Sequence, residues 1–141
     1  MPALTPDLEW LIAVLILNLG LLALVYMLQP LVRDLTLGFA YTLSNFDERR
    51  AESKLGRRLA MVNGNQREAL MLFAPLALIA WVAGVSHPHL SAIATAFLVA
   101  RVTYAVVSTA GIPVARSAAW AVGFVATLYL GWIVWTGLGF A

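Results

Sequence analysis

Four long apolar runs leave this chain few ways to fold. They cover residues 8–32, 68–85, 90–110 and 117–140, and they take up most of the chain. A helix that crosses a bilayer needs about 20 mostly apolar residues, which is close to the length of each run. Only 11% of the 141 residues are charged, against about a quarter in soluble domains. The sequence therefore predicts an all-α integral membrane protein that forms one bundle of four transmembrane helices.

The helices are expected in a single domain spanning residues 1–141, at about 8–32, 56–85, 90–110 and 117–140. The second helix should begin before its apolar run, because no helix breaker follows Gly56. The first run is too long for the apolar segment of a signal peptide and no basic residue precedes it, so it is interpreted as a retained helix. Residues 34–44 either continue the first helix or lie along the membrane interface. Asp47 or Ser53 is expected to cap the second helix.

Basic residues are distributed unevenly around the apolar runs. Seven of the nine Lys and Arg residues lie between the first run and the start of the second: Arg33, Arg49, Arg50, Lys54, Arg57, Arg58 and Arg67. The positive-inside rule then places the loop of residues 33–60 and Arg116 in the cytoplasm and both termini outside. In a bacterium this means the inner membrane. The net charge is only +2, so topology explains these residues and no nucleic-acid partner is expected.

Arg101 is a charged residue in the middle of the third run. It lies about ten residues from the cytoplasmic end, which corresponds to a depth of about 15 Å. A lone charge there costs at least about 2.5–3.5 kcal/mol, so Arg101 needs a partner. Glu68 is the only acidic residue expected at a similar depth, and the two are predicted to interact directly or through one shared polar group. This pair either fixes the helix register or belongs to a functional site.

Two sets of polar residues recur at helical spacing and predict polar stripes. They are Arg58, Asn65 and Glu68 on the second helix, and Arg101, Tyr104 and Ser108 on the third. Residues spaced in this way share one helix face, so the two stripes are expected to line a cleft open to the cytoplasm. The alternative is that they only form hydrogen bonds between helices, which also explains Asn18 in the first helix.

The segment "GIPVARSAAW" offers a second candidate site. Arg116 and Ser117 combine a guanidinium, a hydroxyl and the start of a helix, which suits an anion or a thiolate. The simpler interpretation makes Arg116 a topology charge and Ser117 a helix cap. His87 and His89 lie close together, but no third ligand is near, and no metal site is expected. The chain has no cysteine, so any sulfur chemistry must come from a substrate.

Taken in order, several segments resemble the MAPEG family, the membrane-associated proteins of eicosanoid and glutathione metabolism. They are "LSNFDE", the N-x-x-E of "NGNQREALMLFAP", the Ala-Arg of "FLVARVTYAV" and "PVARSAAW". The resemblance implies a four-helix protomer that assembles as a homotrimer in membrane lipid. It also implies glutathione as cofactor, bound between protomers near the cytoplasmic side.

The resemblance assigns roles residue by residue. Asn65 and Glu68 match residues that hold the glutamyl end of glutathione, Arg101 matches a buried arginine, and Arg116 and Ser117 match the pair at the thiol. Arg58 and Tyr104 complete the candidate cofactor-binding set. Three positions depart from the family pattern, because Met61 replaces an arginine of catalytic members, Ser108 replaces a tyrosine, and Phe46 replaces an arginine common in bacterial members.

Two functions follow from these assignments. The first is a glutathione-dependent transferase or peroxidase acting on lipophilic substrates, with Arg116 and Ser117 as catalytic residues. The alternative, which Met61 and Ser108 favour, is a non-catalytic protein of the same fold. It would serve as a scaffold, a lipid-binding protein or an accessory subunit beside other membrane protein subunits.

Overall fold

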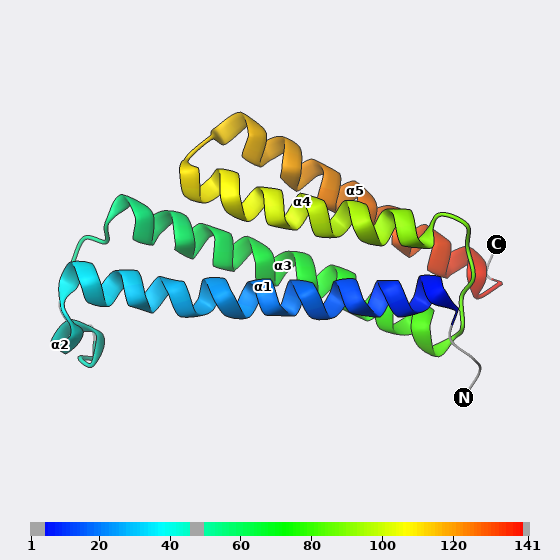
Figure 1. The fold of residues 1–141 in the computed structure, drawn as a ribbon, viewed down its shortest axis with the longest axis horizontal. Helices are drawn as coiled ribbons and strands as arrows, with labels where there is room; N and C mark the ends of the chain where they lie inside the picture. The colour runs from blue at the N-terminus through cyan, green and yellow to red at the C-terminus, as the bar shows by residue number, and fades with distance from the viewer. Residues whose placement is uncertain (1–4, 46–49, 140–141) are drawn as a thin grey trace.

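The chain folds into four long helices and one short one. The computed structural model describes residues 5–45 and 50–139, and these ranges contain helices and no strand. The long helices are α1 (Pro6–Leu37), α3 (Lys54–Val82), α4 (Leu90–Ala110) and α5 (Pro113–Gly137), and α2 (Phe39–Thr42) is a single turn (Figure 1). Each long helix is apolar enough to cross a membrane. The protein is thus a multi-pass integral membrane protein with the expected four-helix architecture.

The ends of the first two long helices follow from local chemistry. α1 continues five residues past position 32 and ends at Gly38, whose φ of +89° suits a residue without Cβ. Residues 34–44 therefore both extend α1 and form α2. Ser53 caps α3, since its side chain accepts a hydrogen bond from the Gly56 amide at 3.0 Å. Asp47, the other candidate cap, lies outside the described residues.

The last helix begins earlier than expected. Pro113 occupies the first helical position of α5, where a missing N–H leaves no hydrogen bond unmade. The capping position belongs to Ile112, and the Ser117 hydroxyl donates to the Pro113 carbonyl at 3.1 Å. The interpretation of Ser117 as the helix cap is therefore wrong. Arg116 and Ser117 lie in the first turns of α5, still close to its N-terminal end.

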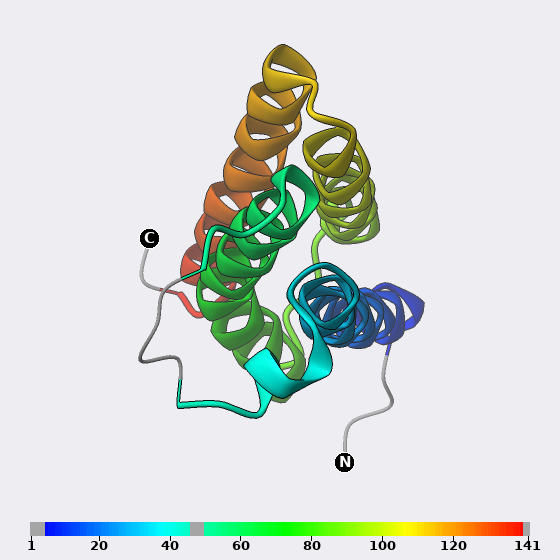
Figure 2. The same ribbon diagram turned by 90° about the vertical axis from the view of Figure 1, so that its left-hand side faces the viewer.

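The helices form a bundle in which α1 and α5 occupy opposite corners. α4 packs against both α1 and α5, and α3 lies next to all three of the others. Both termini and the link between α3 and α4 lie at one end of the bundle, and α2 and the α4–α5 turn lie at the other (Figure 1). Viewed from the α2 end, α4 and α5 form one pair beside α3 and α1 (Figure 2). Toward that end, α5 diverges from α3 (Figure 1).

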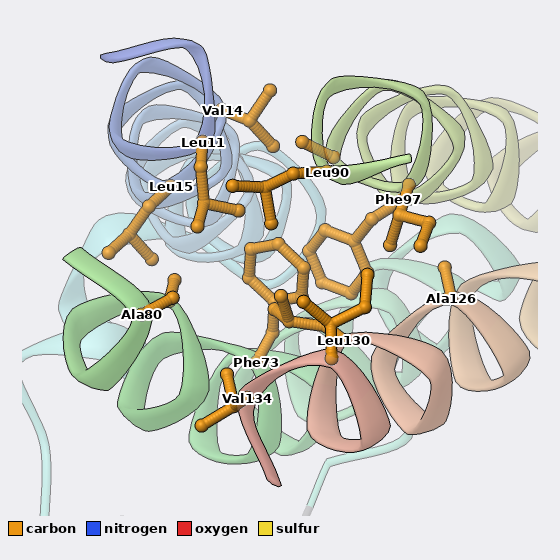
Figure 3. Close-up of a cluster of buried hydrophobic side chains, with 14 of the residues drawn as sticks. Leu11, Val14, Leu15, Phe73, Ala80, Leu90, Phe97, Ala126, Leu130 and Val134 are labelled. Carbon is orange, nitrogen blue, oxygen red and sulfur yellow. The ribbon is translucent and has the colours of Figure 1, made fainter. Parts of the chain in front are cut away.

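The larger of two apolar core clusters fills the half of the bundle that holds the termini. Phe73 of α3 stacks on Phe97 of α4 with ring centroids 3.8 Å apart, and Leu11, Leu90 and Leu130 surround the pair (Figure 3). All five side chains are fully buried. In a bilayer such contacts stabilise the bundle by close packing more than by removal from water. Apart from His87 and His89 in the α3–α4 link, the polar residues of the candidate sites belong to the other half.

Candidate functional site

Arg101 is almost completely buried inside the protomer, with 1% of its surface exposed. Its Nε donates to Gln66 Oε1 at 2.9 Å, and one terminal nitrogen donates to Asn65 Oδ1 at 2.6 Å. The guanidinium carbon also lies 4.8 Å from the centre of the Tyr104 ring. Two amide oxygens and an aromatic face thus stabilise a charge that would be costly in the middle of the membrane if it had no partner.

The predicted interaction between Arg101 and Glu68 is wrong in its direct form, and among the described residues no polar group is hydrogen-bonded to both. Within the described residues the one ion pair joins Arg33 and Glu52, and the Glu68 side chain is exposed. The reason lies in the positions around the helix, because residues 66 and 68 lie about 160° apart and residue 65 lies between them. An arginine that bonds to Gln66 and Asn65 is therefore centred on the side of α3 beyond Asn65 and does not reach the Glu68 carboxylate. Glu68 instead lies beside Arg101 on the wall of a shared pocket.

Gln66 is the partner that the sequence interpretation missed. Its side chain is 1% exposed, and its Nε2 donates to Asn18 Oδ1 at 3.2 Å and to the Asn18 carbonyl at 3.3 Å. A chain of hydrogen bonds therefore links Arg101 on α4, Gln66 on α3 and Asn18 on α1. The signal available in the sequence was the position of Gln66 directly after Asn65, about 100° around the helix. The expected interhelical role of Asn18 is confirmed.

A pocket of about 120 Å³ opens between α3 and α5, with Arg101 at its base. The α3 wall consists of Asn65, Glu68, Ala69 and Leu72, and the α5 wall of Trp120, Gly123, Phe124 and Thr127. The Trp120 and Phe124 rings stack with centroids 5.2 Å apart. Both walls are helical faces with the spacing i, i+3, i+4, i+7. The pocket therefore combines one buried cation, one exposed carboxylate and an aromatic edge.

Arg116 lies one turn before Trp120 on the same face of α5. Its guanidinium contacts the Met61 sulfur at 3.4 Å, and a thioether is only a weak acceptor. The structure gives Arg116 no other hydrogen bond within residues 5–45 and 50–139, so most of its donors remain available to an anion. Ser117 is exposed beside it. Met61 and Arg116 do not line the pocket, but each lies one turn before a residue of its walls, Asn65 and Trp120. The pocket and this contact together are called the α3–α5 cleft, which thus has a cation at one end.

Arg58 is directed away from this cleft. Its guanidinium donates to the carbonyls of Thr109 and Ala110 at 3.1 and 3.3 Å, at the C-terminal end of α4. A cation at this end also interacts favourably with the helix dipole. Gly111 allows the close approach, because a Cβ there would lie 2.2 Å from an Arg58 nitrogen. Its φ of +85° independently favours glycine at this position. Arg58 therefore caps α4 within the protomer.

The polar stripe on α4 is buried between helices. Arg101, Tyr104 and Ser108 are 1%, 5% and 2% exposed, and of the three only Arg101 lines the pocket. The Ser108 hydroxyl is buried without a hydrogen-bond partner among the described residues. Two polar stripes facing each other across an open cleft are thus not observed on α3 and α4, and the open cleft lies between α3 and α5. Phe46 lies outside the described residues.

The two histidines of the α3–α4 link take part in local contacts. His87 Nδ1 accepts a hydrogen bond from the His89 amide at 3.1 Å, and His89 Nδ1 lies 2.8 Å from the Tyr129 hydroxyl. Across residues 5–45 and 50–139, no three side chains of His, Asp or Glu gather as a metal would require.

A comparison with protein families identifies the fold. The family model described as MAPEG matches residues 9–136, a range that contains all four long helices almost completely and every candidate site residue. No curated protein and no solved structure matches the chain. The family includes glutathione-dependent transferases and peroxidases. A family match over nearly the whole sequence, together with four membrane-spanning helices, shows that the chain belongs to the MAPEG family.

Proposed function

We propose that this protein is a glutathione-dependent transferase or peroxidase that acts on lipophilic substrates within the membrane. The observation that supports it best is the arrangement of charge along the α3–α5 cleft. Arg116 contacts Met61 at one end, and Glu68 lies seven residues further along α3, about 10 Å at the rise of a helix. Three extended residues span about 10–11 Å. A tripeptide with an ammonium at one end and a thiol along its length matches this spacing.

The polar groups of the pocket suit the glutamyl end of glutathione. The exposed Glu68 carboxylate can pair with its ammonium, and the Asn65 amide and the Arg101 guanidinium can bind its carboxylate. Tyr104 lies against Arg101 on the buried side and would hold the guanidinium in place. Arg58, which caps α4, would act only by positioning the end of that helix.

The mouth of the cleft suits the thiol. A free thiol has a pKa near 8.5, so only a few per cent is thiolate at neutral pH. The Arg116 guanidinium and the N-terminal end of α5 favour the thiolate form. The Ser117 hydroxyl must rotate away from the Pro113 carbonyl in order to donate to the sulfur. The thiolate then attacks an electrophilic carbon and forms a carbon–sulfur bond as the leaving group departs. With a peroxide, two glutathione molecules become a disulfide, and the peroxide becomes an alcohol and water.

We further propose that the protein is a homotrimer in membrane lipid. A volume of 120 Å³ is below the range of about 300–1,000 Å³ for small-molecule sites, so a neighbouring copy is needed to enclose a tripeptide. Native mass spectrometry in mild detergent should show a mass of three chains. A stable monomer or dimer would contradict the proposal.

The proposed orientation is with both termini outside and the basic end in the cytoplasm. In the structure the described residues Arg33, Arg50, Lys54, Arg57 and Arg116 lie at or near the ends of α1, α3 and α5 that meet α2 and the α4–α5 turn. Because the chain has no cysteine, a single cysteine at position 54 can be labelled from either side. Labelling from the cytoplasmic side alone is expected, and labelling from outside would reverse the assignment.

The activity is tested by turnover of purified protein in mild detergent. An aryl halide and a fatty-acid hydroperoxide serve as substrates, each with and without glutathione. Glutathione-dependent product formation from at least one of them is expected. Absence of turnover with both substrates, in a protein that retains its trimeric mass, would speak against an enzyme.

The second candidate function is a non-catalytic scaffold, a lipid-binding protein or an accessory subunit of a larger membrane complex. It is favoured by Arg101, whose hydrogen bonds to Asn65 and Gln66 are made within one protomer and need no ligand. Met61 favours it as well, because a thioether beside Arg116 adds no charge for an anion. Co-purification of other membrane subunits with a protein that binds no glutathione would support this candidate.

A further inference from the structure

A second hollow lies between α4 and α5, on the side of α5 opposite the α3–α5 cleft. Its volume is about 570 Å³, inside the range of small-molecule sites. The hollow exists because small side chains face it from both helices, namely Ala92, Ala96, Ala121 and Ala126. The whole lining, residues 89–96 of the α4 side and 121–129 of α5, follows the helix axes for about 10–12 Å. We call this hollow the α4–α5 groove.

Polar groups occur at only one end of the α4–α5 groove. His89 and Tyr129 line that end, and they are hydrogen-bonded to each other at 2.8 Å. His87 is adjacent, and its Nδ1 accepts the His89 amide hydrogen, so its own ring hydrogen is on Nε2. Neither Nε2 atom has a hydrogen-bond partner among the described residues. The His87 Nε2–H is therefore available to donate a hydrogen bond at the mouth of an otherwise apolar groove, and the His89 Nε2–H is available when the Tyr129 hydroxyl donates to His89 Nδ1.

This polar end lies at the membrane surface on the side of the termini. His89 directly precedes α4, and Trp132 stacks on Tyr129 with ring centroids 5.3 Å apart. Tryptophan and tyrosine concentrate at the level of lipid headgroups. The groove then descends from that level toward the middle of the bilayer. A ligand that fits must be an amphiphile with a hydrogen-bond acceptor at one end and an aliphatic chain behind it.

We propose that the α4–α5 groove binds one phospholipid from the leaflet on the side of the termini. An acyl chain fills the space along the alanines, and a phosphate oxygen accepts a hydrogen bond from His89 or His87. No lysine or arginine lies in the link between α3 and α4, so the imidazole groups are the side chains of this link that can donate to the phosphate. The site is independent of the glutathione site, because it uses a different face of α5.

Native mass spectrometry of the protein in mild detergent tests this site, with added phosphatidylglycerol or diacylglycerol of the same chains. One phosphatidylglycerol per chain should remain bound, at least tenfold more than diacylglycerol. Ala92→Leu with Ala121→Leu should fill the groove and reduce retention of both lipids about tenfold. Ala118→Leu adds the same side chain on an exposed part of α5 outside the groove and should leave retention unchanged. His87→Phe with His89→Phe should remove the preference for the phosphate-bearing lipid, and a preference that persists in this variant would contradict the assignment.

Three other results would also overturn the proposal. The first is equal retention of the two lipids by the unmutated protein, and the second is failure to retain one phosphatidylglycerol per chain. The third is a loss of lipid in Ala118→Leu as large as the loss in Ala92→Leu with Ala121→Leu. If the filled variant loses its assembled mass instead of lipid, the groove is an interface between copies and the phospholipid assignment is wrong.

Discussion

Replacing Gln66 with leucine should lower the free energy of unfolding by about 2–3 kcal/mol. Gln66 supplies the acceptor for Arg101 Nε and the donor for Asn18. Leucine has a similar volume but leaves a buried guanidinium N–H and a buried amide oxygen without partners, and each unsatisfied group costs about 1–3 kcal/mol. Asn65 and Tyr104 remain in contact with Arg101, so the loss is partial. Thermal or denaturant unfolding of the detergent-solubilised protein measures the effect.

The double variant Gln66→Leu/Arg101→Met is the control for this interpretation. Removing the cation along with its acceptor removes the unpaired charge, so the double variant should be more stable than Gln66→Leu alone. Glu68→Gln should leave the stability within about 0.5 kcal/mol of the unmutated protein, as expected for an exposed side chain without an ion pair. A loss from Glu68→Gln as large as that from Gln66→Leu would restore the ion pair and contradict the structure.

Replacing Arg116 with alanine should reduce glutathione turnover by about ten- to a hundredfold at neutral pH. If the guanidinium stabilises the thiolate, removing it raises the thiol pKa, and each unit lowers the thiolate fraction about tenfold. Ultraviolet absorbance of the thiolate, followed against pH with glutathione present, reports the effect directly. At high pH the difference from the unmutated protein should shrink, because the thiol ionises without assistance.

Arg67→Ala is the matched control, since it removes an exposed arginine of α3 that does not line the cleft. It should leave the thiolate absorbance and the turnover unchanged. An unchanged thiolate absorbance in Arg116→Ala would remove Arg116 from the mechanism. Equal losses in the two variants would mean that only the general positive potential of this end of the protein matters.

Apolar length was sufficient to predict the number and order of the long helices. α4 matches its expected bounds because the Ser-His-Pro-His link and Gly111 interrupt the apolar pattern on both sides. The start of α5 was misplaced because Ser117 is a good helix cap by residue type, whereas Pro113 suits the first helical position and begins the helix one turn earlier. Residue preference alone cannot decide between two such signals.

The polar site was predicted less completely, for a geometric reason. Helical spacing correctly placed Asn65 and Glu68 on one wall of the pocket and required a partner for Arg101. It could not give the rotation of α3 relative to α4, and that rotation brings Gln66 rather than Glu68 to Arg101. Arg58 lies on the same predicted stripe as Asn65, but the nearby end of α4 engages it instead. Both outcomes depend on how the helices cross.

Calorimetric titration of the purified trimer with glutathione tests the central claim most directly, namely that the α3–α5 cleft binds this tripeptide. Saturable binding is expected at glutathione concentrations like those in cells. Glu68→Gln should weaken it about tenfold, through loss of a charge-assisted hydrogen bond to the ammonium. Arg67→Ala should bind as the unmutated protein does. Absence of binding by the folded trimer, or equal affinity in Glu68→Gln, would contradict the assignment of this cleft.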